Sequence, residues 1–130
     1  MPGYDDVRRI ALELPGAEER VSRDMLQWRV GGRLFVWERP LRRSDLAALG
    51  DAAPDGPILG ARVEHEVAKQ ALLRSEPEVF FTTPHFDRSP IVLVRLDAIS
   101  GDELREVVVE AWLCRAPPRL VQDYRRAYSS

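Results

Sequence analysis

The sequence is poor in the residues that most often build disulfides and metal sites. Cys114 is the only cysteine among 130 residues, so no internal disulfide can form, and the chain suits a reducing compartment. It has two histidines and one lysine, and no apolar run approaches the ~20 residues that a membrane-spanning helix needs. The first ten residues are charged and lack the apolar segment of a secretory signal. We therefore expect a cytoplasmic protein without a membrane partner.

Motifs that mark common catalytic and cofactor sites are also absent. There is no phosphate-binding glycine loop, no G-x-G-x-x-G and no G-x-S-x-G nucleophile turn. The short sequence from His85 to Asp87 offers two possible metal ligands, but a closed zinc site needs four. Cys114 lies near the end of a predicted helix, where the helix dipole disfavours a thiolate. We expect a solvated helix face from the acidic residues Asp102, Glu103, Glu106 and Glu110. The sequence thus predicts no catalytic residues, no metal, no cofactor and no enzymatic activity, and an enzyme stays an alternative only if His85 and Asp87 converge on a metal in a deep pocket.

The composition that remains is that of an ordinary folded protein, with 45% hydrophobic and 31% charged residues. A chain of this length usually forms one domain and buries roughly two-thirds of its unfolded surface. Val7, Ile10, Ala11 and Leu14 fall on one side of a helix, which the Pro15-Gly16 pair should end. We predict a single compact domain over residues 1–130, and a monomer.

Turn residues divide the rest of the chain into short strands and further helices. Strands are predicted over residues 20–22, 26–30, 33–38, 58–63, 79–83 and 90–96. Helices are predicted over 44–49, around 67–72, from Ser100 with a capping box to Glu103, and from Pro118. Their core-facing residues are expected to be Val67, Ala68, Ala71 and Leu72, then Leu104, Val107, Val108, Ala111 and Trp112, then Leu120, Val121 and Tyr124. This order predicts an α+β fold, an antiparallel sheet with helices packed on one face.

The clearest strand pair surrounds Gly31-Gly32, a dipeptide that tolerates the backbone angles of a two-residue hairpin turn. Uniform pairing from this turn places Val30 opposite Arg33, Trp28 opposite Phe35 and Leu26 opposite Trp37. Because side chains alternate between faces, one face should carry Leu26, Trp28, Val30, Phe35 and Trp37. The other face should carry Gln27, Arg29, Leu34, Val36 and Glu38. We expect the aromatic face to be buried, which would contribute several kcal/mol.

Arginine is concentrated around this hairpin, although the whole chain has a net charge of -2. Residues 20–43 contain seven arginines against two acidic residues. Guanidinium groups match phosphate oxygens, whereas base stacking is disfavoured if the aromatics face the core. The candidate phosphate or anion contacts are Arg29, Arg33, Arg39, Arg42 and Arg43, and Arg20 and Arg23 could extend the patch. An ordinary solvated surface is the alternative interpretation.

Four segments taken in order resemble the MmcQ/YjbR family. They are IALELPGAEE (10–19), WRVGGRLFVW (28–37), VFFTTPHFDRSPIVLVRLDAIS (79–100) and DELREVVVEAWLCRAPPRLV (102–121). The resemblance implies a compact α+β domain with a CyaY-like arrangement, which has been likened to a double-wing DNA-binding architecture. No catalytic residues define that family, so none carry over. Arg33 stands where many members have lysine, and PIVLVRL lacks the early aromatic that many carry.

From charge and resemblance together, we expect a non-catalytic protein that binds DNA weakly through backbone phosphates. The competing expectation is a domain that binds a small anion or an acidic protein through the same arginines, with no role at nucleic acid.

Overall fold

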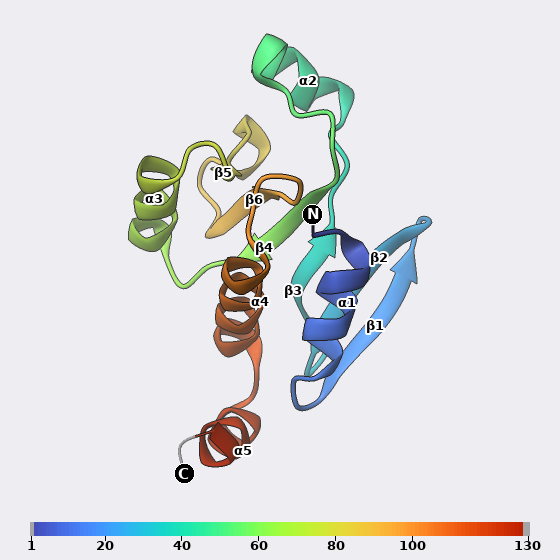
Figure 1. The fold of residues 1–130 in the computed structure, drawn as a ribbon, viewed down its shortest axis with the longest axis vertical. Coiled ribbons are helices and arrows are strands. Elements are labelled where there is room, and N and C mark those ends of the chain that lie inside the picture. The colour runs from blue at the N-terminus through green and yellow to red at the C-terminus, as the bar shows by residue number, and fades with distance from the viewer. Residues whose placement is uncertain (1, 129–130) are drawn as a thin grey trace.

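The strands form one antiparallel sheet with the order β1-β2-β3-β4-β6-β5 (Figure 1). The computed structural model describes residues 2–128. The strands are β1 (Ala17–Ser22), β2 (Met25–Val30), β3 (Arg33–Glu38), β4 (Ile58–Arg62), β5 (Phe80–Phe81) and β6 (Ile91–Arg95). The helices are α1 (Tyr4–Leu12), α2 (Arg43–Leu49), α3 (Glu66–Ser75), α4 (Gly101–Arg115) and α5 (Pro118–Tyr128), with 3-10 turns η1 (Gly50–Ala52) and η2 (Pro84–Phe86). The predicted α+β class is confirmed.

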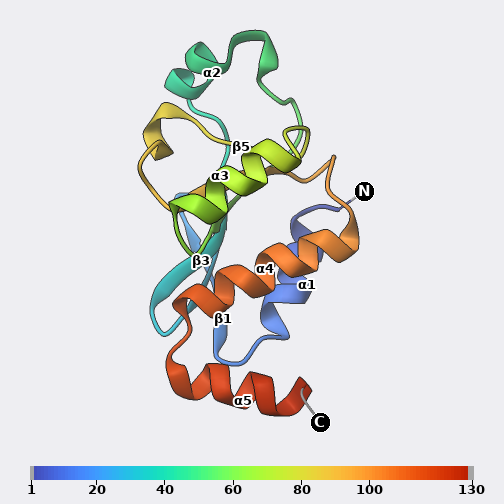
Figure 2. The same ribbon diagram turned by 90° about the vertical axis from the view of Figure 1, so that its left-hand side faces the viewer.

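Helices α1 and α4 lie side by side on one face of the sheet, and Figure 2 shows them in front of the strands. Their buried residues are those that helical spacing predicts: Val7, Ile10 and Ala11 in α1, and Leu104, Val108, Ala111 and Trp112 in α4. The Ser100 hydroxyl caps α4 by accepting a hydrogen bond from Glu103 N at 3.1 Å. Helix α5 continues this layer, since Tyr124 packs against Trp112 with ring centroids 5.3 Å apart. The main core therefore lies between the helices and this face.

Helix α3 buries a lysine where an apolar stripe was predicted. Val67 is 71% exposed, whereas Lys69 is fully buried. The Lys69 ammonium donates hydrogen bonds to the backbone carbonyls of Phe86 and Ser89. The helix predicted around 67–72 is confirmed, but the prediction that Val67 and Ala71 face the core is wrong, because this side of α3 turns Lys69 toward the polar turn around η2. Leu72 and Leu73 still pack against the main core.

A β-bulge in the hairpin changes which aromatic residues share a face. Pairing follows the prediction next to the turn, with Val30 opposite Arg33, but it shifts between Trp28 and Arg29 so that Trp28 lies opposite Val36. Two residues of β3 then oppose one of β2, which bends the strand and offsets the alternation. Phe35 and Val36 are both buried in the main core, whereas Trp37 packs on the opposite face. The prediction that Trp37 shares the face of Trp28 is wrong.

Candidate functional site

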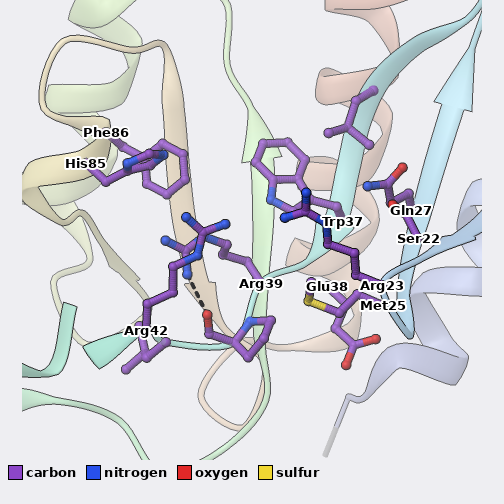
Figure 3. A pocket seen from close by; sticks show the side chains of 13 residues that line it. Ser22, Arg23, Met25, Gln27, Trp37, Glu38, Arg39, Arg42, His85 and Phe86 are labelled. Carbon is purple, nitrogen blue, oxygen red and sulfur yellow. Dashed lines mark hydrogen bonds between the residues drawn. The ribbon is translucent and has the colours of Figure 1, made fainter. Parts of the chain in front are cut away.

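The face of the sheet away from α1 and α4 carries a groove of about 530 Å³. Its floor comes from β2 and β3, one wall from the β1–β2 turn, and the other from residues 39–42 and η2 (Figure 3). This volume lies within the range of about 300–1,000 Å³ that is usual for small-molecule sites. Cationic, aromatic and apolar side chains all contribute to the lining: Arg23, Arg39 and Arg42, then Trp37, His85 and Phe86, then Met25, Leu34 and Leu41.

Trp37 forms the aromatic part of the floor and lies directly over Gly60 of the neighbouring strand β4. A Cβ atom placed on Gly60 would come within 2.4 Å of Trp37 Cε2 and 2.6 Å of Trp37 Nε1. Only glycine therefore permits the indole to lie against this strand. The core tryptophans donate their indole N–H groups to Glu19 (Trp28) and to the Pro15 carbonyl (Trp112). Within residues 2–128, no such acceptor is found for the N–H of Trp37.

The β1–β2 turn holds Arg23 and Asp24 at positive φ, 53° and 64° respectively. Two-residue hairpin turns need these angles, and Asn-Gly or Gly-Gly usually supply them. For residues with a Cβ the left-handed region costs about 1 kcal/mol or more each. The turn thus carries an arginine at a position where glycine would be less strained, and in Figure 3 the Arg23 side chain extends toward the indole of Trp37.

The opposite wall is fixed by a buried ion pair between Arg39 and Asp45. Arg39 Nη2 lies 3.0 Å from Asp45 Oδ2, and the two side chains are only 6% and 2% exposed. Arg39 also donates to the Pro40 carbonyl, and its guanidinium lies over the Phe86 ring, 5.2 Å from the centroid. Burial alone would raise the pKa of Asp45, but the hydrogen bond from Arg42 N and the charge of Arg39 hold it below its usual value.

The other predicted arginines do not form one continuous ridge. Arg42 and Arg43 are exposed at the start of α2, and Arg42 lines the groove. Arg29 is half-buried and donates to Gln27 and to the Gly32 carbonyl. Arg33 is exposed but belongs to another cluster, around Arg115. Burial lowers the pKa of Arg115, and the charges of Arg62 and Arg33 lower it further.

Arg39 is the one predicted contact that the structure places inside the molecule, at 5% exposure. The expectation that it points outward as a phosphate contact is therefore corrected. Its charge is already neutralised by Asp45, whose position on the first turn of α2 could not be read from the spacing of arginines.

The remaining candidate groups stay apart from one another. His85 is exposed and packs edge-on against Phe86 at 4.7 Å, and no cluster of three metal-ligating side chains occurs within residues 2–128. Burial raises the pKa of the Cys114 thiol, in line with the expected unreactive thiol. Glu103 departs from the expected solvated helix face, because a hydrogen bond with Glu76, burial and nearby carboxylates raise its pKa to about 7.

Sequence reasoning missed the contribution of Trp37, Gly60 and η2 to this groove. One signal was present, since Leu34 to Trp37 are four consecutive apolar residues, which strict alternation with one solvated face does not explain. No helix in the described part of the chain is long and apolar enough to cross a membrane.

Comparison with known proteins gives concordant results. A family model described as YjbR matches residues 12–114. Uncharacterised proteins of Mycobacterium bovis and Mycobacterium tuberculosis are 50% identical over 127 residues, which cover 95% of this chain and 96% of each relative. The crystal structure of the Deinococcus radiodurans protein DR2400, with its DUF419 domain, matches with a TM-score of 0.69 at 22% identity, covering 98% of this chain and 88% of that chain. This last likeness concerns the fold alone.

Proposed function

Because the chain belongs to the YjbR family, and because several of its arginines lie around the groove on the face of the sheet away from α1 and α4, we propose that it is a non-catalytic protein that binds nucleic acid through backbone phosphates. The contacts assigned here are Arg23, Arg29, Arg42 and Arg43. Arg39 instead positions the segment that carries Arg42 and Arg43. The curated relatives are uncharacterised, so the proposal is based on the charges of this chain.

One observation carries the proposal, namely that the arginines around the groove have no carboxylate partner. Other arginines are paired, since Arg8 lies 2.7 Å from Glu19 and Arg105 lies 3.1 Å from Glu13. Within residues 2–128, no carboxylate lies within 4 Å of the four contact arginines, which are Arg23, Arg29, Arg42 and Arg43. Guanidinium groups without a carboxylate keep their full charge for phosphate oxygens, which their planar donors match, although Arg29 also donates to Gln27 and Gly32.

Counterion release provides the test. Each phosphate contact contributes about -0.9 to the slope of log K against log salt, so four contacts predict a slope of about -3.6. Raising salt from about 50 to about 200 mM should then weaken duplex binding by roughly 150-fold. Fluorescence anisotropy of a labelled duplex measures this. A slope near zero, or no binding at about 50 mM salt, would contradict the proposal.

A matched pair of charge reversals localises the contact. R42E/R43E changes the charge at the groove, and R125E/R126E makes the same change in net charge on α5. We expect the first variant to lose at least about tenfold in duplex affinity and the second to lose less than about twofold, because exposed charges are screened beyond about 10 Å at 0.1 M salt. Equal losses would indicate attraction by overall charge alone. If neither variant alters binding, the groove arginines do not contact the duplex, which contradicts the proposal and favours the alternative of a small anion or an acidic protein.

A further inference from the structure

We propose that the groove over Trp37 holds one unpaired nucleotide, with its base against the indole and its phosphate between Arg23 and Arg42. This inference deepens the proposed function, since it names the unit of nucleic acid that this side of the molecule recognises. The ligand chemistry is a planar heterocycle joined to a phosphate, which either a free nucleotide or a single strand can present.

The floor of the groove has the properties of a stacking platform. One side of the Trp37 indole lies on the bare backbone of Gly60, so the ring is held in place and its other side is directed to the groove. Trp37 is partly exposed, whereas the other two tryptophans, Trp28 and Trp112, are fully buried. Stacking on an aromatic side chain tolerates every base, because each base has a π-face.

The two rims bring positive charge to either side of this platform. Arg23 lies on the β1–β2 turn and Arg42 on the opposite wall, and both side chains are exposed. The one carboxylate that lines the groove, Glu38, already accepts a hydrogen bond from Leu26 N at 3.0 Å. An aromatic floor between two guanidinium groups fits a ring with an anionic substituent better than a neutral apolar ligand.

The strained turn is a second and independent indication. Arg23 keeps a long cationic side chain at φ 53°, where glycine would remove the strain. Strain of this kind is concentrated where a side chain is needed at a binding site. Nothing in the core requires Arg23, because the residue is exposed.

The same geometry favours an unpaired base over a duplex. In a duplex both faces of each base are covered by its neighbours, so reaching Trp37 would require the base to be unstacked first. A duplex can therefore use the arginines but not the indole. This separates the nucleotide site from the general phosphate contacts.

Tryptophan fluorescence tests the inference with AMP, adenosine, inorganic phosphate, a twelve-nucleotide single strand and the matching duplex as probes. We expect AMP and the single strand to quench part of the emission and to shield Trp37 from acrylamide. Adenosine and inorganic phosphate should each bind at least about tenfold more weakly than AMP, because adenosine lacks the phosphate and inorganic phosphate lacks the base. Comparable affinity for AMP and for one site of the strand identifies a free nucleotide, and tighter binding of the strand identifies a polymer.

Two variants of one turn provide the matched control. R23G and D24G each relieve one residue at positive φ, but only R23G removes the guanidinium. R23G should lose about tenfold or more in AMP affinity, and D24G should bind as the parent does. If AMP and single strands quench nothing while the duplex still binds with a steep salt slope, the inference is wrong and the phosphate-binding function stands. If no probe binds at low salt, both fail.

Discussion

The ion pair between Arg39 and Asp45 should be one of the costliest single sites in the molecule to disrupt. Asp45→Asn keeps the shape of the side chain but leaves the Arg39 guanidinium buried without a counter-charge. Breaking a buried pair in this way costs about 3–5 kcal/mol. A domain of this size has a total stability of about 5–15 kcal/mol. Each kcal/mol lost lowers Tm by a few degrees, so the expected fall in Tm is roughly 10–20 °C.

Urea unfolding followed by circular dichroism measures the effect, with Arg43→Met as the control. Arg43 is exposed on the same segment, so its replacement should change stability by less than about 0.5 kcal/mol. The double variant R39M/D45L removes both charges together and should cost only about 1–2 kcal/mol, most of it from the lost hydrogen bond that Asp45 accepts from Arg42 N at 2.8 Å. A D45N cost below about 1 kcal/mol would show that water reaches the pair, and the account of this wall would fail.

The pH dependence of this pair has a definite sign. The folded-state pKa of Asp45 lies below its ordinary value. The ion pair therefore stabilises the fold above the unfolded pKa of about 3.9, and this contribution is lost as the pH falls through the folded pKa. The difference between the parent and D45N should accordingly shrink in acid.

Three further changes probe other parts of the structure. Lys69→Met removes the donor for one buried and one partly buried carbonyl and should lower stability by about 2–4 kcal/mol in urea unfolding, with hydrogen exchange rising first around η2. Gly60→Ala forces a Cβ against the Trp37 indole and should lower Tm and increase quenching of tryptophan by acrylamide, whereas unchanged quenching would show that the ring is not seated there. The Glu103 pKa of about 7 lies above the unfolded value, so its contribution is complete below about pH 4.5 and is lost as the pH rises through 7. Glu103→Gln should therefore raise Tm at pH 8 and have little effect at pH 5, and an equal shift at both would exclude repulsion from Glu76 as the cause.

The elements that sequence predicted well are those set by local spacing. The apolar stripe of α1 from Val7 to Ala11 follows directly from a 3.6-residue period, and the Gly31-Gly32 turn follows from backbone angles that few other residues accept. Both depend only on residues close together in the chain. The α+β class followed from the order of these elements.

The features that sequence missed all depend on distant partners. Alternation through β3 assumed a period of two from end to end, and one extra residue at the bulge moved Trp37 to the other face. Lys69 was buried because its ammonium meets carbonyls of a loop that follows β5, and Arg39 because Asp45 faces it. A charged residue is predicted to be exposed unless its partner is known. The sequence could therefore predict which arginines lie near the site, but not how they are arranged in it.

The net charge of -2 gives the protein little long-range attraction to a polyanion, so any such binding must come from contacts at short distance. The structure separates the charges, with the groove arginines on one side of the sheet and, on α4 and just after α3, a group of carboxylates that helps to raise the pKa of Glu103 to about 7. At 0.1 M salt, exposed charges more than about 10 Å apart are largely screened from each other. The acidic helices therefore oppose a ligand in the groove only weakly, and neutralising them should change affinity far less than reversing Arg42 and Arg43. In a mildly acidic protein, the proposed binding of phosphate therefore depends on the local arrangement of the arginines and not on the total charge.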